Sequence, residues 1–244
     1  INLNGHTLTK SSGSTMFKNT TITNGEIKTP ETDDSSIVSA IKEIDSSYLF
    51  GINSTGTMYG YGFVEASKNS TLDSCSVNGK IISQEGNASA FAYKSTNSTF
   101  RNIEIGNEQQ TSVLITSSIA VSDFGMAGIL KYNETNTACI IGARIYDLCF
   151  DTQKSTVKAD NVYWGGVTDK IDSTDKIKIY GNISIANFTT KIKVTSGYLY
   201  TFADIYLGGI AGEAYGETGK SSDYDFALSG AQTKMSSIVS GYSY

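Results

Sequence analysis

The stretch AFAYKSTNSTFRNIEIGN at residues 90–107 has a near copy in GFVEASKNSTLDSCSVNG at residues 62–79. Repeats with a period of about 20–50 residues are typical of solenoids and arrays, in which each unit buries its apolar side chains against its neighbours. The aligned positions carry residues of similar character: Asn69 and Asn97, Leu72 and Phe100, Cys75 and Ile103, Val77 and Ile105.

A third, looser copy runs over residues 126–142. It places Asn133 at the position of Asn97, and Cys139 at the position of Ile103. The step from Asn97 to Asn133 is longer than the step from Asn69 to Asn97, so the unit recurs with insertions.

The composition favours strands and turns. The chain has 24 Gly and 15 Tyr but one Pro and one His, and Ile, Val and Thr are frequent, so we expect an all-β protein. The net charge of −5, with Arg101 and Arg144 as the only arginines, disfavours nucleic acid and anionic membranes as partners. No apolar run approaches the roughly 20 residues that span a bilayer, so no membrane insertion of this segment is expected.

A short pattern recurs along the chain: an apolar residue, any residue, then Asn or Ser. Asn tolerates the left-handed backbone that a bend between sheets needs, and stacked Asn amides can hydrogen-bond from layer to layer. The chain is therefore predicted to be a parallel β-helix, a β-solenoid, with an enclosed ladder at its bends. The predicted ladder residues are Asn24, Ser74, Asn102 and Asn187.

The prediction treats residues 1–244 as one β-helix segment. Residues 29–36 are polar and contain the only Pro, which predicts a loop. Residues 37–44, IVSAIKEI, are predicted as a strand or a single helical turn. Neither end shows a capping pattern, so we expect the segment to continue into more protein or to stack on a neighbour.

The copies resemble the repeat known as GLUG, with a Gly-x-x-Gly opening, an Asn near the middle and a Cys/Ile-x-Val-x-Gly close. The glycine-pair opening is clearest at residues 208–212. Residues 1–27, with the phrase NLNGHTL, resemble the first turns of pectate-lyase-like right-handed parallel β-helices. The resemblance implies that fold. It also implies a place among the large surface and adhesin proteins of bacteria and some protists.

The three cysteines cannot form a full disulfide framework. Cys75 and Cys139 take an apolar repeat position, which predicts buried free thiols. Stacked in order, these two would lie two layers apart, beyond the ~7 Å between Cα atoms that a disulfide allows. A bond between Cys139 and Cys149 stays open as the alternative.

Two segments match binding motifs in part. AYGETGKS at residues 214–221 fits a loose phosphate-loop pattern, but a strand-like pattern follows, and too little of the chain remains after Ser221 for the rest of a nucleotide-binding sheet. We interpret it as a Gly-rich turn. Asp169, Asp172 and Asp175 could gather Ca²⁺ but miss the spacing of a calcium loop.

The remaining candidate residues for catalysis, metal binding or sugar binding also lack clear partners in the sequence. Asp223 and Asp225 would share one strand face, as acid–base pairs on β-helices do, although apolar/polar alternation explains them without a function. His6 has no marked partners for a metal site or a catalytic triad. Trp164 could stack a sugar, but a lone Trp that ends an apolar strand is more often packed in the core. The sequence therefore predicts no catalytic residue, no metal and no cofactor.

Asn-x-Ser/Thr sequons make several asparagines candidates for N-glycosylation if the chain is secreted by a eukaryote. Asn187 also stands in a sequon, but an enclosed ladder residue would not be accessible. The candidates are Asn19, Asn53, Asn69, Asn87, Asn97, Asn133 and Asn182.

The expected function is non-enzymatic: a cell-surface or extracellular structural segment, such as an adhesin stalk or a filament subunit. Its partners would be protein or glycan on a cell surface, or further copies joined end to end. The first alternative is a polysaccharide lyase or glycosidase, which needs Asp/Glu clustered with Lys or Arg on one outer face. The distance in sequence between Arg101 and Arg144 disfavours it. The second alternative is a non-catalytic glycan-binding module that uses Trp164 and surface Tyr.

Overall fold

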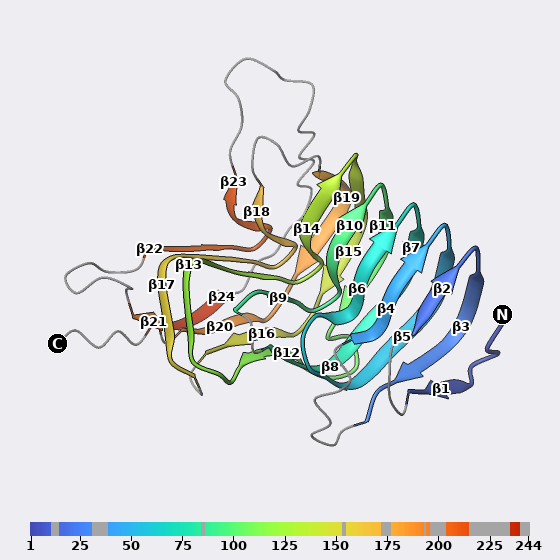
Figure 1. Cartoon of the computed structure of the whole chain (residues 1–244), viewed down its shortest axis with the longest axis horizontal. Helices are drawn as coiled ribbons and strands as arrows, with labels where there is room; N and C mark the ends of the chain where they lie inside the picture. The colour runs from blue at the N-terminus through green and yellow to red at the C-terminus, as the bar shows by residue number, and fades with distance from the viewer. Residues whose placement is uncertain are drawn as a thin grey trace, which may run out of the picture.

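The computed structural model describes residues 1–10, 15–30, 39–83, 86–152, 155–171, 177–192, 194–195, 204–214 and 235–239. Within these ranges the protein is all-β and contains no helix, and every paired strand runs parallel to its partner. The all-β prediction is confirmed. Figure 1 shows the strands as successive layers that follow the chain from the N-terminal to the C-terminal end.

Three faces make up the structure. Sheet 1 contains β2 (Met16–Lys18), β4 (Ser39–Asp45), β6 (Gly62–Lys68), β10 (Ala92–Thr96) and β14 (Leu130–Thr135), and a two-stranded sheet of β18 (Thr168–Ile171) and β23 (Ala211–Ala214) lies alongside β14. Sheet 3 contains β9 (Ala88–Ser89), β13 (Ile119–Ala127), β17 (Val157–Gly165), β21 (Val194–Thr195) and β22 (Asp204–Gly208).

Sheet 2 is 12-stranded and bends along its length. Its strands are β1 (Thr7–Thr9), β3 (Thr21–Lys28), β5 (Tyr48–Met58), β7 (Thr71–Asp73), β8 (Ser76–Ser83), β11 (Thr99–Ile105), β12 (Thr111–Ile115), β15 (Ala138–Ile145), β16 (Leu148–Asp151), β19 (Ile177–Ile185), β20 (Phe188–Ile192) and β24 (Met235–Val239).

The chain visits the sheets in the same order again and again, and we call one such circuit a pass. In one pass β10, β11, β12 and β13 follow each other, and in the next β14, β15, β16 and β17 pair with them one for one. The register therefore stacks equivalent side chains. One buried apolar column contains Ile22, Leu49, Leu72, Phe100, Ile140 and Ile179. Burial of each such side chain contributes about 1.5–3 kcal/mol.

Residues with left-handed backbone mark two bends. Between sheets 1 and 2 they have φ between +47° and +61°, and within sheet 2 between +49° and +74°. L-residues avoid this region, and Gly and Asn tolerate it best. At the first bend stand Asn19, Ser46, Asn69, Asn97 and Asn136. At the second stand Asn24, Gly51, Ser74, Asn102, Gly142 and Gly181.

The four predicted ladder residues all have left-handed backbone, but they do not all stand at the same bend. Asn24, Ser74 and Asn102 share the second bend, but Asn187 (φ +55°) directly precedes β20 and lies one bend later. In the passes after Asn102, the second bend is occupied by the glycines Gly142 and Gly181. All four predicted side chains are exposed rather than enclosed, because the bends lie on the outer surface.

Amide stacking occurs at the first bend. The Nδ2 of Asn97 donates to the Oδ1 of Asn69 across 3.1 Å, from one pass to the next. Both residues have left-handed backbone, so the same position provides the bend and a contact between layers.

The third repeat copy is misaligned in the sequence prediction. Asn133 lies opposite Ser95 rather than Asn97, and the register shifts after this pair, between Ser95 and Thr96. Cys139 lies opposite Thr99, and Ala143 takes the inward position opposite Ile103. The prediction that Cys139 is buried is therefore wrong, since its side chain is only half-buried.

The cysteines are all free, so the alternative of a bond between Cys139 and Cys149 is contradicted. Cys75 and Cys149 are buried. Burial raises the pKa of the Cys75 thiol to about 12, which keeps it protonated and unreactive at neutral pH.

The passes differ in length, and a late one is the longest. Successive passes reach the first bend at Asn19, Ser46, Asn69, Asn97 and Asn136, and the widest of these intervals is the last. The added length lies in sheet 3, which begins at β9 and extends through β13 and β17. Figure 1 shows these long strands as an added face on the side away from the N-terminus.

Two local predictions from the sequence fall in the N-terminal half. Residues 39–44 form a strand, as predicted for the segment 37–44, of which residues 37 and 38 lie outside the described ranges. Most of the polar loop at residues 29–36 also lies outside them.

We predict that Asn102→Val lowers the free energy of unfolding by about 1–2 kcal/mol, because a β-branched residue resists φ near +49°. Asn102→Gly, which installs the residue that Gly142 provides in the next pass, should change it by less than ~0.5 kcal/mol. Urea unfolding of the two variants compares them directly. Equal losses would mean that the Asn102 amide, rather than its backbone, stabilises the bend.

Candidate functional site

The residues singled out from the sequence are not brought together. His6 is exposed near the N-terminus, whereas Trp164 is fully buried. The Trp164 ring packs edge-on against Phe124 and Phe150, each with a centroid distance of 5.7 Å. The core role of Trp164 is confirmed, and stacking of a sugar on it is excluded. Outside the described residues lie Asp172, Asp175, Asp223, Asp225 and residues 215–221 of the glycine-rich segment.

The structure instead forms a corner where sheet 3 turns into sheet 1. We call it the inner corner, and define it as the outward side chains of β13, β17 and β22 together with those of β10, β14 and β18. Side chains of the two faces contact each other across the turn. The Nζ of Lys170 lies 5.0 Å from the centroid of the Tyr163 ring. A Cβ on Gly125 would collide with Asp169 and Lys131, so glycine is required for this close approach.

Tyrosines line both sides of the inner corner. On the sheet 1 side, the ring of Tyr93 lies 4.2 Å from that of Tyr61, on the segment just before β6, and 5.3 Å from that of Tyr132. On the sheet 3 side, Tyr163 and Tyr206 stack with a centroid distance of 5.1 Å and an interplanar angle of 13°. Tyr163 is buried, whereas the rings of Tyr61, Tyr93, Tyr132 and Tyr206 are at least partly exposed and give apolar surfaces with polar edges.

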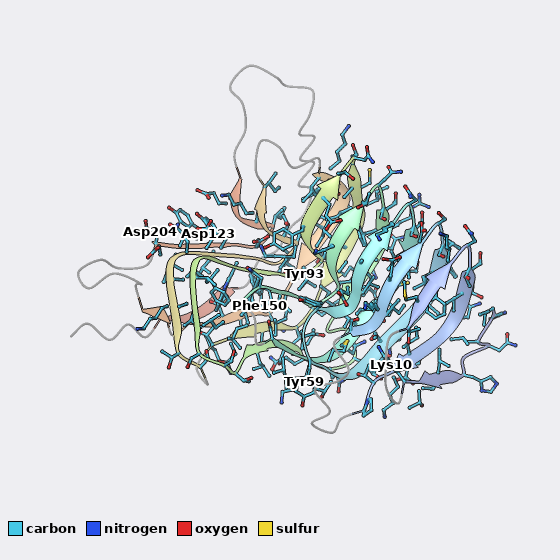
Figure 2. All side chains as sticks on the ribbon, viewed as in Figure 1. Lys10, Tyr59, Tyr93, Asp123, Phe150 and Asp204 are labelled. Carbon is cyan, nitrogen blue, oxygen red and sulfur yellow. The ribbon has the colours of Figure 1, made fainter. Side chains whose placement is uncertain are left out.

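A polar row runs beside the stacked tyrosines. Asp123, Asn161 and Asp204 occupy equivalent positions on three adjacent strands. The Nδ2 of Asn161 donates to the Oδ1 of Asp123 across 2.9 Å. Two strand spacings separate the two carboxylates, which is roughly 9.5 Å. Figure 2 shows Asp123 and Asp204 on the same side of the molecule, with Tyr93 further along toward sheet 1.

A buried ion pair lies at the base of the inner corner. Lys131 on β14 and Asp169 on β18 are in direct contact, and their side chains are 6% and 4% exposed. The Nζ of Lys131 also lies 4.2 Å from the centroid of the Tyr132 ring. Burial raises the pKa of the Asp169 carboxyl, and the neighbouring Lys131 opposes this rise.

The two arginines lie on adjacent strands although they are far apart in sequence, three positions from each other in the register. Arg101 on β11 pairs with Asp73, and Arg144 on the adjacent β15 pairs with Glu104, each at 3.5 Å. Both flank the second bend, where an open groove of about 490 Å³ is lined by Ser74, Asn102, Glu104, Gly142, Arg144 and Asn182.

The candidate sequons divide into two groups by environment. Asn19, Asn69, Asn97 and Asn182 are exposed. Three others are half-buried and hydrogen-bonded: the Oδ1 of Asn53 accepts from the Oγ of Ser76, the Oδ1 of Asn87 accepts from the amide of Gly125, and the Nδ2 of Asn133 donates to the carbonyl of Asn136.

The sequence contains one signal that could have identified the inner corner. The tripeptides Asp123-Phe124-Gly125, Asn161-Val162-Tyr163 and Asp204-Ile205-Tyr206 share a polar–apolar–small or aromatic order. The intervals between them are longer than the spacing of the early repeats, so a search at the early period does not align them.

Comparisons of the chain with protein-family models, with curated proteins and with solved structures return no match. Among the described residues, no group of three or more His, Cys, Asp or Glu side chains is arranged to hold a metal ion. In the same part of the chain, no helix is long and apolar enough to cross a membrane.

We predict that Lys131→Met lowers the free energy of unfolding by about 3–5 kcal/mol, because it leaves the Asp169 carboxyl buried without its partner. Lys94→Met is the matched control: Lys94 pairs with Glu134 between adjacent strands at 3.3 Å, but both side chains are exposed, so the loss should stay below ~1 kcal/mol. Thermal and urea unfolding measure both. Equal effects would contradict the buried environment of Lys131.

Proposed function

We propose that the chain is a segment of a right-handed parallel β-helix that acts outside the cell as a structural, adhesin-like element without catalysis. The one-for-one parallel pairing of successive passes supports the helix, as does the resemblance of residues 62–79 and 90–107 to GLUG repeats. Such a scaffold repeats its outer surface at each layer, which suits a stalk or filament that presents side chains to a partner.

The proposed partner is a glycan on a cell surface, held in the inner corner. The observation that carries this proposal is the stacked pair Tyr163–Tyr206 beside the row of Asp123, Asn161 and Asp204. A sugar ring presents an apolar C–H face and a rim of hydroxyls. The face can pack on a tyrosine ring, and the hydroxyls can hydrogen-bond to carboxylate and amide oxygens two residues along the same strands.

A glycan array followed by titration of the best ligand tests this function. We expect binding without turnover, and we expect Tyr206→Ala to weaken it about 3- to 10-fold, through loss of the partly exposed ring of the pair. Tyr48→Ala is the matched control, because Tyr48 stacks on Phe50 on a different sheet and is 36% exposed. A folded chain that binds no glycan, or an equal loss with Tyr48→Ala, would contradict the proposal.

A second candidate, a β-helix glycosidase, is favoured by the two carboxylates of the polar row. A separation of roughly 9.5 Å lies at the upper end of the roughly 6.5–9.5 Å used by inverting glycosidases. Against this, Asp123 and Asp204 are both exposed, whereas a general acid is usually held protonated by an apolar environment.

Release of reducing ends from the glycan that binds best separates the two candidates. The adhesin-like function predicts no release, from either the native chain or Asp204→Asn. Release by the native chain that falls by about 10²-fold or more in Asp204→Asn would replace the structural proposal with the enzymatic one.

A further inference from the structure

Lys131 and Asp169 occupy neighbouring positions on adjacent parallel strands. The backbone amides of Ile129 and Leu130 both donate to the carbonyl of Val167, which sets β18 against β14 in this register. The two side chains then point the same way and meet in direct contact. They differ from the other paired side chains of sheet 1, such as Lys94 and Glu134, which are 44% and 46% exposed.

The environment of the pair excludes water. Gly125 packs beneath both side chains, leaving no space even for a methyl group, and the ring of Tyr132 covers the Lys131 Nζ on another side. Removal from water disfavours the charged carboxylate, and burial raises the pKa of the Asp169 carboxyl accordingly. A proton shared within such a pair converts an ammonium and a carboxylate into a neutral amine and a neutral carboxylic acid.

We propose that Lys131 and Asp169 are joined by an intramolecular amide bond between the Lys131 Nζ and the Asp169 Cγ. The neutral amine attacks Cγ, the N–C bond forms, and the bond from Cγ to the carboxyl hydroxyl breaks. One proton passes from Nζ to the departing hydroxyl, and one water is released. No oxidant, reductant or cofactor is needed. Two groups held in contact react as if at effective concentrations of roughly 10⁵–10⁸ M, which compensates for a poor leaving group.

The bond would link two successive passes, since β14 belongs to one and β18 to the next. It would replace two buried charges with one neutral amide, and it would fasten sheet 1 at the point where sheet 3 meets it. This inference does not depend on the proposed function, because it concerns the covalent structure of the scaffold itself.

Intact-mass measurement of the purified native chain tests the bond directly. We expect a mass lower than the sequence mass by one water, and a branched proteolytic peptide that joins the segments containing Lys131 and Asp169. The full sequence mass, with both residues recovered in unmodified peptides, would overturn the proposal without any need for a variant.

Lys131→Arg separates the amide from an ordinary ion pair, because arginine keeps the positive charge but cannot form this bond. It should show its full sequence mass, while Lys94→Arg, the control at the exposed pair, should still lack one water. A missing water that persists in Lys131→Arg would place the loss elsewhere and overturn the proposal.

Discussion

A left-handed backbone residue at the same point of every pass is the constraint on which the rest of the structure depends. Side chains alternate between the two faces of a strand, so a bend displaced by one residue would turn the following inward side chains outward. Asn102 and Gly142 keep the bend in place from one pass to the next. Because the bend is fixed, Phe100 meets Leu72 on one side and Ile140 on the other, and the core becomes a set of continuous columns.

The same constraint determines where polar grooves form on the outer surface. The bends place small or polar residues on the outside, which leaves shallow polar grooves such as the one beside Arg144. The inner corner differs from these grooves, because it requires the outward faces of two sheets to approach each other. The two outward faces meet only in the passes that include sheet 3. Their close approach requires glycine at position 125 and at the turn residues 128 and 165. The inner corner is therefore a consequence of lengthened passes, and the proposed glycan contacts and the proposed amide bond both depend on it.

The sequence predicted the features that recur at short, regular intervals. Strand composition, the parallel stacking, and the bends at Asn24, Ser74 and Asn102 all follow from a local pattern. Cys75 and Ile103 were correctly assigned to the core, because the first two copies have the same length. The prediction failed where the length changed. Asn133 lies opposite Ser95 and Cys139 lies opposite Thr99, two and four positions away from the repeat alignment, and no local pattern revealed this register.

The candidate site was less predictable than the fold, for a physical reason. Asp123, Asn161 and Asp204 meet only because three long strands pair in register although they are far apart along the chain. Likewise, Arg101 and Arg144 were judged to be apart from their distance in sequence, although adjacent passes bring their strands together. In stacked parallel structures the pass, and not the distance along the chain, decides which side chains are neighbours.

Disulfide formation between neighbouring passes tests the register of this stack most directly. In Thr99→Cys the new thiol should pair with the native Cys139 on mild oxidation, because the strands run ~4.8 Å apart and a disulfide spans Cα atoms about 4.4–6.8 Å apart. Peptide mapping by mass spectrometry identifies the bond. The structure predicts a bond in Thr99→Cys and none in Ile103→Cys, the position that repeat alignment places opposite Cys139. The opposite result would contradict the register, and with it the bends, the columns and the inner corner.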